Sequence, residues 1–329
     1  MFERMEELAA SETLLSAHAR YAAHTAEACG YAFRSLDGAD GYLFEVSDGA
    51  RRATFAAGAG TPYALNDARA ASLARDKAFC AEALRQAGVP TLPGRMFFVT
   101  TRWRDMRSPG RELENAMAFA ATAEYPFFCK PISASNGLYA EVIEDVEAFA
   151  DYTQRVGREH FAILVQPYIQ APEHRVFVLN GEALFSYEKS LPQVRGDGRR
   201  TLRELVQSLP RESESPPPKP RGRDAQGHLL GPEDIPYGVI TLEGPANRAA
   251  GGGASALCDG AAEPMARLAV AAATAIGLSL AAVDLFDRGG AGLAVIEINS
   301  NPMIATLEDH GRWDLIETIW RANIEAALK

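Results

Sequence analysis

The sequence predicts an α+β protein of two lobes, preceded by a small N-terminal α/β unit. Helices and strands are mixed along the chain, and short turns join strands into antiparallel hairpins. This mixture favours α+β lobes over one doubly wound sheet. The length of 329 residues suggests two or three lobes of about 100–200 residues each. The hydrophobic share of 47% is ample for a sizeable core.

The N-terminal unit is expected over residues 1–68. It opens with a helical stretch over about 5–28 and continues with strands, paired at the turn SDGA. A second helical pattern runs from Arg69 to Ala87 and ends at Gly88, ahead of Val89-Pro90. It begins the first lobe, residues 69–165. We expect strands in GRMFFVT, YPFFCKP and FAILVQPYI, and a helix in VEAFADYTQRV.

The second lobe is expected over residues 166–329. The stretch HRVFVLNGEALFSYEKS predicts a hairpin turning at Asn180-Gly181. After the short helix TLRELVQSL, the polar, proline-rich residues 210–236 predict a loop, part of a flap over 196–236. A helix ending at Gly277, two strands and a C-terminal helix complete the chain.

Composition argues against several classes of partner. The net charge of −10 disfavours nucleic acid, because phosphate binding needs a basic face. Four scattered cysteines without CxxC spacing favour free thiols in a reduced cytoplasm. The start MFERMEELAASETLL lacks the apolar core of a signal peptide. We expect a cytoplasmic protein with no nucleic-acid or membrane partner, and a homodimer stays open.

Lysine usage points to a small set of candidate residues. The chain has 28 arginines but five lysines, and three of these occupy predicted helices or strands: Lys77, Lys130 and Lys189. A lysine ammonium is a compact point charge that suits phosphate oxygens. A charge at a strand end is costly without a partner, so Lys130 is the strongest candidate. Surface lysines lying along apolar side chains are the alternative interpretation.

A second set of candidates lies late in the chain, in GLAVIEINSNPMI. Glu297 and Asn299 are two residues apart on a predicted strand, so they share a face at roughly 6.6 Å. The linker DRGGAG predicts a hairpin that puts Asp284 beside Glu297. Two carboxylates and an amide oxygen are hard ligands suited to Mg²⁺. An acid paired with a buried arginine is the structural alternative.

Other catalytic signatures are absent from the sequence. It contains neither the GxxxxGK[ST] phosphate loop nor the GxGxxG dinucleotide fingerprint. The six histidines form no HxxxH or HExxH pattern, and there is no GxSxG nucleophile elbow. The stretch PISASNGLYAEV after Lys130 could still cover phosphates with backbone N–H groups.

Taken together, these stretches resemble the ATP-grasp superfamily of carboxylate–amine ligases. The likeness is closest to the ligase module of cyanophycin synthetases and of bifunctional glutathione synthetases. It runs from about Arg69 to Met303 and is carried by the order and spacing of DKAFCAEALRQAGVPTLPG, FCKPISASNG, VQPYIQAPEHRVFVLNGEALFSYEKS, PANRAAGGGA and VIEINSNPMI. The resemblance implies an ATP-grasp fold in which the two α+β lobes clasp ATP.

The resemblance also implies three sets of site residues. Those expected to contact ATP are Lys77, Lys130, Ser135, Asn136, Gly137, Gln166, Tyr168, Ile169 and Glu173. Those expected to have catalytic roles are Arg175, Lys189 and Asn247. Those expected to bind Mg²⁺, or Mn²⁺ in its place, are Asp284, Glu297 and Asn299.

The implied activity is that of an ADP-forming ligase. A carboxylate attacks the γ-phosphate of ATP to give an acyl phosphate, and an amine then displaces phosphate to form an amide. The expected substrates are a small-molecule carboxylate and an amine, either amino acids or a small peptide. Two alternatives stay open: a kinase that phosphorylates a small molecule, and an ATP-binding partner subunit with weak activity. The flap over 196–236 is the candidate lid.

Overall fold

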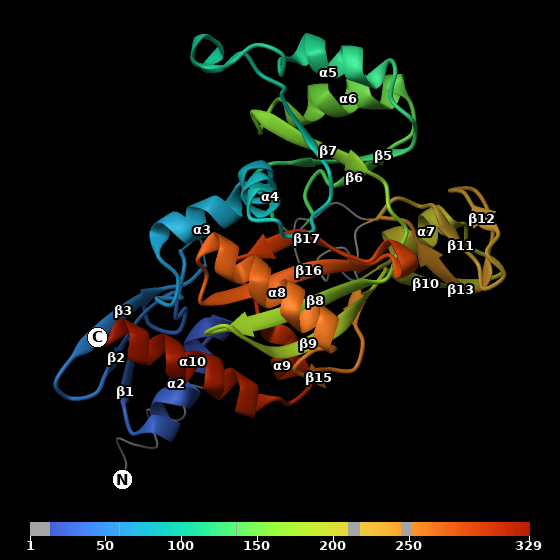
Figure 1. The fold of residues 1–329 in the computed structure, drawn as a ribbon. Coiled ribbons are helices and arrows are strands. Elements are labelled where there is room, and N and C mark those ends of the chain that lie inside the picture. The colour runs from blue at the N-terminus through green and yellow to red at the C-terminus, as the bar shows by residue number, and fades with distance from the viewer. Residues whose placement is uncertain (1–13, 59, 136, 210–217, 245–251) are drawn as a thin grey trace.

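The computed structural model describes residues 14–58, 60–135, 137–209, 218–244 and 252–329. In these residues the strands form four antiparallel sheets, with helices packed beside them (Figure 1). The predicted α+β class is therefore confirmed. The predicted domain limits at residues 68 and 165 stay a prediction.

The N-terminal residues form a helix and a three-stranded sheet. Helix α2 (Ala17–Cys29) begins at Ser16, whose hydroxyl accepts a hydrogen bond from the Ala19 N–H, and ends at Gly30 with φ 70°. Strands β1 (Ala32–Ser35), β2 (Leu43–Ser47) and β3 (Arg52–Ala56) follow in sheet order. These elements pack against the C-terminal helix α10 (Trp313–Ala327), whose Trp320 is fully buried. Residues 14–57 and helix α10 therefore share one core.

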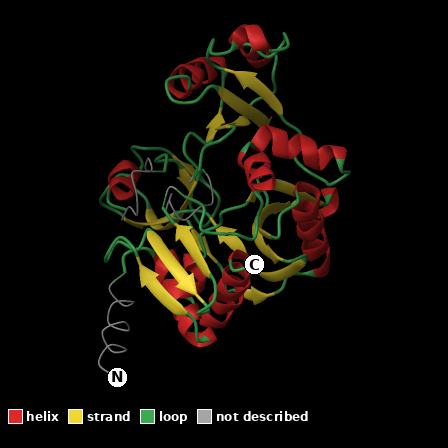
Figure 2. Cartoon of the chain, turned by 90° about the vertical axis from the view of Figure 1, so that its left-hand side faces the viewer, coloured by secondary structure: helices red, strands yellow, loops and turns green. Residues whose placement is uncertain are grey.

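The first lobe contains a sheet of order β4-β7-β5-β6. Its strands are β4 (Arg95–Phe98), β5 (Phe127–Pro131), β6 (Glu141–Ile143) and β7 (Ala162–Pro167). A 3-10 turn at Arg104–Met106 precedes α5 (Leu113–Ala120), and α6 (Val146–Val156) lies beside α5. Both helices cover the outer side of the sheet, at the top of Figures 1 and 2.

The central sheet has the order β14-β9-β8-β16-β17, with β15 also paired to β9. Its strands are β8 (Glu173–Leu179), β9 (Glu182–Ser190), β14 (Gly253–Ala254), β15 (Cys258–Asp259), β16 (Leu280–Asp287) and β17 (Leu293–Asn299). The predicted β8–β9 hairpin is confirmed, and Asn180 and Gly181 have φ 50° and 85°. Positive φ at both central residues is the requirement of a type I′ turn.

Helix α8 (Glu263–Ile276) covers one face of the central sheet. It ends at Gly277, which has φ 86°, so the apolar run 268–286 is a helix followed by strand β16. Among the described residues, no helix is both long and apolar enough to span a bilayer. After β17, the short helix α9 (Ala305–Asp309) leads to α10.

The flap prediction was wrong about the loop. Strand β10 (Gln193–Asp197), helix α7 (Leu202–Gln207), β11 (Gly222–Arg223), β12 (Leu229–Leu230) and β13 (Tyr237–Leu242) form a sheet of order β10-β13-β11-β12 with one helix. This unit has its own small apolar core. Two-residue strands are too short to show alternation, so the sequence pattern could not reveal β11 and β12. Residues 210–217 of the predicted loop lie outside the described residues.

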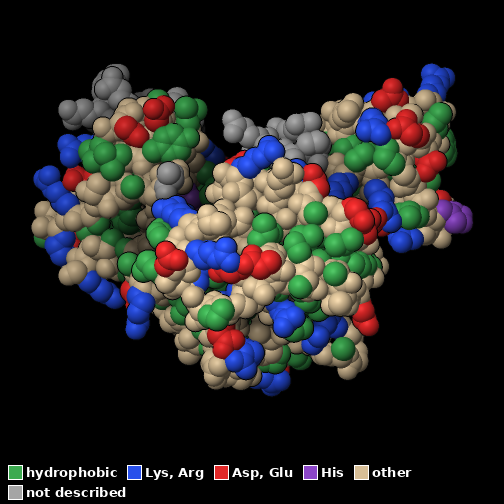
Figure 3. All heavy atoms as spheres, turned by 90° about the horizontal axis from the view of Figure 1, so that it is seen from above, with side chains coloured by type: hydrophobic (Ala, Val, Ile, Leu, Met, Phe, Trp, Pro, Cys, Tyr) green, Lys and Arg blue, Asp and Glu red, His purple; other side chains and the backbone are tan. Residues whose placement is uncertain are grey.

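Two ion pairs join this flap to the first lobe. Lys219 lies 3.4 Å from Glu141, and Arg221 lies 2.5 Å from Glu144. Figure 3, which views the molecule from above, shows basic and acidic side chains interspersed on the face that it presents. At least one partner of each pair is well exposed, so each pair should contribute at most about 1 kcal/mol to the contact between this unit and the first lobe.

Candidate active site

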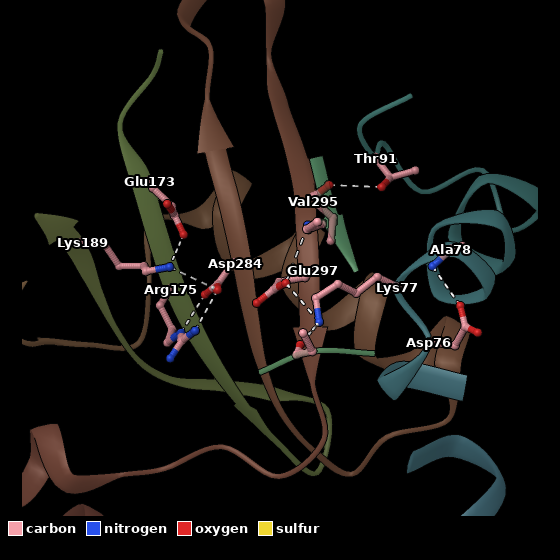
Figure 4. Close-up of polar contacts among 12 residues, drawn as sticks. Asp76, Lys77, Ala78, Thr91, Glu173, Arg175, Lys189, Asp284, Val295 and Glu297 are labelled. Carbon is pink, nitrogen blue, oxygen red and sulfur yellow. Dashed lines mark hydrogen bonds and ion pairs between the residues drawn. The ribbon is translucent and has the colours of Figure 1, made fainter. Parts of the chain in front are cut away.

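One face of the central sheet is apolar at one end and charged at the other. Strand β16 alternates, so Leu280, Ala282 and Asp284 point to the same side. Leu280 and Ala282 pack into the core around Trp320, whereas Asp284 lies beyond that core, paired in register with Arg175. Figure 4 shows the charged side chains gathered at this end, from β8, β9, β16, β17 and helix α4 (Lys77–Gln86).

Asp284 is the centre of the first group of charges. Its side chain is 1% exposed, and Arg175 donates two hydrogen bonds to the two carboxylate oxygens, each 2.7 Å long. Lys189 lies 3.3 Å away. Burial acts to raise the pKa of Asp284, but Arg175 and Lys189 outweigh it and lower the pKa to about 2. The carboxylate is therefore ionised and fully paired in this structure.

Lys189 links Asp284 to Glu173. Its ammonium donates to Glu173 as well as to Asp284. Burial acts to lower the pKa of Lys189, but the two carboxylates outweigh it and raise the pKa. Burial raises the pKa of Glu173, although Lys189 acts against it. The structure thus brings together Glu173, Arg175, Lys189 and Asp284.

Glu297 is the centre of the second group. Its carboxylate lies 3.7 Å from the Lys130 ammonium and 3.9 Å from that of Lys77. Burial acts to raise the pKa of Glu297, but both lysines outweigh it and lower the pKa. Burial lowers the pKa of Lys130, and nearby Lys77 acts in the same direction. For Lys130, burial therefore outweighs the stabilising effect of Glu297 on the charged form.

The two groups meet because Asp284 and Glu297 are directly opposite each other in the β16–β17 ladder. The predicted neighbourhood of these two acids is therefore confirmed. A β-bulge allows this facing. Asp284 pairs with Glu297 and the next residue, Leu285, pairs with Val295, so Ile296 is left unpaired. Val295 packs on the α8 side. Without the extra residue Glu297 would face the same side as Val295.

The segment after α4 covers the bulged edge of β17. The Val295 N–H donates to the Pro90 carbonyl over 2.9 Å, and the Val295 carbonyl accepts from the Leu92 N–H at 3.2 Å and the Thr91 hydroxyl at 3.1 Å. Figure 4 shows the Thr91 contact beside Glu297. The bulge is thus fixed from both sides, by β16 and by the residues that follow α4.

Lys77 owes its position to an N-cap that was not predicted. The single helix expected over 69–87 is two helices, α3 (Ala68–Arg75) and α4, broken at Asp76. The Asp76 carboxylate accepts hydrogen bonds from the N–H groups of Ala78 and Phe79, both 3.0 Å long. Lys77 is therefore the first residue of α4. Its ammonium donates to the Ala134 carbonyl at 2.6 Å.

The ion pairs form two groups, and the facing of Asp284 and Glu297 on β16 and β17 sets them side by side as one cluster of four cations and three carboxylates. Its members are Lys77, Lys130, Glu173, Arg175, Lys189, Asp284 and Glu297. The cluster has a surplus of one positive charge in a largely buried place. Burying an uncompensated charge is unfavourable, so the cluster is suited to receive an anion.

Other predicted residues lie on β7, on the link that follows it and in the turn between β5 and β6. Gln166, which is 3% exposed, lies on β7, and Tyr168 and Ile169 follow on the link to β8. Ser135 and Gly137 lie in the turn between β5 and β6, and Gly137 has φ 71°. Within the part of the chain that the structure describes, no hydrogen bond or ion pair joins Ser135, Gly137 or Ile169 to the cluster. Asn136 and Asn247 lie outside the described residues.

The chemistry of the donors fits Mg²⁺ only in part. Among the described residues, no three His, Cys, Asp or Glu side chains come together as a metal site. Asn299 follows Glu297 by two positions, and its buried Nδ2 has no hydrogen-bond partner. Nδ2 is a hydrogen-bond donor and cannot bind a cation, so a ligand role for Asn299 would rest on its Oδ1. Mg²⁺ usually completes its shell with water and phosphate oxygens.

Curated proteins of similar sequence are ligases. The glutathione biosynthesis bifunctional protein GshAB of Streptococcus mutans is 28% identical over 209 residues, covering 54% of this chain and 27% of that protein. Cyanophycin synthetase of Geminocystis herdmanii is 25% identical over 175 residues, covering 52% and 18%. D-alanine–D-alanine ligase of Ectopseudomonas mendocina is 29% identical over 126 residues, covering 38% and 36%. The chain therefore spans well under half the length of these relatives.

No family model matches the chain. Among solved structures, a bifunctional glutathione synthetase from Pasteurella multocida aligns with 89% of this chain and 42% of its own, at 22% identity and a TM-score of 0.48. A D-alanine–D-alanine ligase from Bacillus anthracis aligns with 78% and 68%, at 13% identity and the same TM-score. The sequence relatives confirm the predicted resemblance of this chain to the carboxylate–amine ligases of the ATP-grasp superfamily.

Proposed function

We propose that this protein is an ATP-dependent carboxylate–amine ligase that forms an amide or peptide bond through an acyl phosphate and releases ADP. The observation that carries the proposal is the buried cluster with its surplus positive charge. It offers ammonium and guanidinium groups from both lobes to one anion. The sequence similarity to ligases supports the same activity.

The cluster can accept a triphosphate by exchanging partners. In the structure, Glu297 forms ion pairs with Lys77 and Lys130, and Asp284 forms ion pairs with Arg175 and Lys189. A bound triphosphate would draw these cations to its own oxygens. Lys77 and Lys130 are our candidates for holding the phosphates, and Gln166, Tyr168, Ile169 and Glu173 for the adenine and ribose. Glu173 would have to leave Lys189 to reach a ribose hydroxyl.

Asp284, Glu297 and Asn299 are the residues that would hold Mg²⁺ once their cations have turned to the nucleotide. When bound, the ion would neutralise charge on the β- and γ-phosphate oxygens. Arg175 and Lys189 then lie where they can stabilise negative charge on the phosphoryl group in transfer. Ser135 and Gly137, in the β5–β6 turn, are our candidates for covering it through their N–H groups.

In the first step, an oxygen of the substrate carboxylate attacks the γ-phosphorus, and the bond to the β-phosphate oxygen breaks. In the second step, the amine nitrogen attacks the acyl carbon, phosphate leaves, and the amine loses a proton. This chemistry asks the protein for positioning and charge rather than for a covalent nucleophile. The proposed substrates are an amino acid or small peptide and an amine. The cytoplasmic location and a homodimer stay predictions.

The test is a screen of amino-acid pairs with ATP and Mg²⁺, following ADP, free phosphate and product mass. A ligase requires the amine for turnover, releases equal amounts of ADP and phosphate, and yields a product lighter by one water than its two substrates together. A phosphorylated product without phosphate release would instead identify a kinase. Absence of nucleotide binding in calorimetry, with or without Mg²⁺, would refute the proposal.

A further inference from the structure

The turn between β5 and β6 contains a residue in an unusual conformation. Tyr139 has φ 55°, and only two other described non-glycine residues, Trp103 and Asn180, share a positive φ. Asn180 belongs to a hairpin turn, where asparagine tolerates this conformation well. A tyrosine does not, because its Cβ comes close to the following carbonyl oxygen in the left-handed conformation. Such a residue persists only where its surroundings hold it in place.

Three neighbours hold Tyr139. Its hydroxyl donates to the Glu159 carboxylate over 2.7 Å, and its carbonyl accepts from the Tyr152 hydroxyl at 2.9 Å. Its ring meets the His160 ring edge-on, with 5.7 Å between the centroids. Tyr152 is fully buried in the core of the first lobe. Tyr139 therefore ties the turn to α6 and to the residues that lead into β7.

The other end of the turn is held by Lys77. The Lys77 N–H donates to the Ile132 carbonyl at 2.8 Å, and its ammonium donates to the Ala134 carbonyl at 2.6 Å. Lys77 is the residue that the proposed function sends to the nucleotide phosphates. Once its ammonium turns to phosphate, the bond to Ala134 is lost. The contacts of Tyr139 do not depend on the nucleotide, so they remain when the site fills.

We propose that Tyr139 is a positioning residue, which anchors the β5–β6 turn so that its N–H groups face the phosphates of the bound nucleotide. The inference rests on the proposed function for its ligand but not for its geometry. Lys77, which would lose its bond to Ala134 when nucleotide binds, and Tyr139, whose contacts would remain, hold opposite ends of one short turn. The turn can then follow the nucleotide at the Lys77 end without leaving the first lobe.

The geometric half is tested in the ligand-free protein. Tyr139→Phe removes the hydroxyl and keeps the ring. The lost bond goes to a carboxylate, so we expect amide hydrogen exchange in residues 132–140 to accelerate about tenfold. Exchange in β16 and β17 should stay unchanged. Tyr125→Phe is the matched control, because its hydroxyl donates to the Ala120 carbonyl at 2.7 Å in the same lobe, away from the turn.

The functional half compares two ligands by calorimetry. ATP reaches the turn through its phosphates, whereas adenosine does not. Tyr139→Phe should weaken ATP with Mg²⁺ about tenfold and leave adenosine unchanged. Tyr139→Gly suits the positive φ but lacks the ring, and it should lose as much ATP affinity. Full ATP affinity in Tyr139→Gly would show that only the backbone conformation matters and would overturn the role of the side chain.

Unchanged exchange and unchanged ATP affinity in Tyr139→Phe would also overturn the proposal. An equal loss for ATP and adenosine would do the same, since it would reveal a general effect on the fold. Failure of the wild-type protein to bind ATP refutes the proposed function instead. In that case the exchange experiment still decides whether Tyr139 anchors the turn.

Discussion

Replacing Lys130 by methionine separates the two effects of a buried ammonium. The Lys130 side chain is 6% exposed, and its carboxylate neighbour, Glu297, lies 3.7 Å away. Burial lowers the pKa of Lys130, which means that the folded protein disfavours the charged form. Lys130→Met removes that unfavourable charge and keeps a side chain of similar length. We therefore expect the ligand-free variant to unfold at a temperature no lower than the wild-type protein.

Nucleotide binding should respond in the opposite direction. A hydrogen bond to a charged group contributes about 1.5–3 kcal/mol, so ATP with Mg²⁺ should bind roughly 10- to 150-fold more weakly. At an ATP concentration of about 100 times the wild-type Kd, binding stabilises the folded protein by about 2.7 kcal/mol. A variant with about 100-fold weaker binding would gain only about 0.4 kcal/mol at that concentration. Nearly all of the ATP-dependent rise in melting temperature should disappear.

The assay is titration calorimetry combined with thermal unfolding, with and without ATP and Mg²⁺. Lys329→Met, at the exposed end of the chain, is the control for loss of one positive charge. Affinity within twofold of the wild-type value would remove Lys130 from the phosphate site. A large drop in melting temperature without nucleotide would contradict the argument from burial.

Three further predictions concern single side chains. Glu297→Ala should lower turnover in saturating Mg²⁺ by about 100-fold or more, on the scale of a lost electrostatic contact. The control is Glu82→Ala, at an exposed position of α4. Wild-type turnover in Glu297→Ala would exclude Glu297 as a ligand. Asp284→Asn should destabilise the fold by about 3–5 kcal/mol at neutral pH, since Arg175 and Lys189 lose their counter-charge. The wild-type protein should lose the Asp284 contribution as pH falls from about 4 through its pKa of about 2, so unfolding curves of the two proteins that stay equally far apart at low pH would refute the pairing. Burial lowers the pKa of His18 to about 4, so its contribution is complete above about pH 6.5 and falls by up to ~3 kcal/mol on the way to pH 4. His18→Phe should flatten the slope of unfolding free energy against pH in urea titrations, and an unchanged slope would contradict this origin.

Local signals in the sequence were sufficient where one or two residues determine a conformation. Asn180-Gly181 has the composition of a type I′ turn, and Gly277 separates helix from strand because glycine adopts the required positive φ without a steric cost. The sequence predicted that Asp284 and Glu297 lie opposite each other, because a short linker joins the two apolar runs that contain them. The two clusters of lysines and acids could be inferred because a charge in an apolar strand needs a partner.

Tertiary contacts decided what the sequence could not show. Asp76 breaks a continuous helical pattern because its carboxylate caps α4, although an aspartate just before the lysine was the available signal. Strands β11 and β12 are too short for any periodicity, and β13 pairs with β10 and β11 rather than with β12, the strand that precedes it in the sequence. Tyr139 was hidden because its strain depends on Tyr152, Glu159 and His160, which lie in or beside α6.

The single unpaired residue at Ile296 has a consequence for anyone who redesigns this chain. Directly opposite residues of a regular antiparallel ladder share a face, so grafting only Asp284 and Glu297 onto another ribbon would keep the acids side by side. The residue two positions before the glutamate would then lie on the acids' face, whereas in this chain that residue, Val295, packs on the α8 side. A graft that keeps both faces of the strand would copy the two acids together with the unpaired Ile296 and with residues 90–92, which hydrogen-bond to Val295. A one-residue deletion there would leave composition almost untouched and reverse the strand's inner and outer sides.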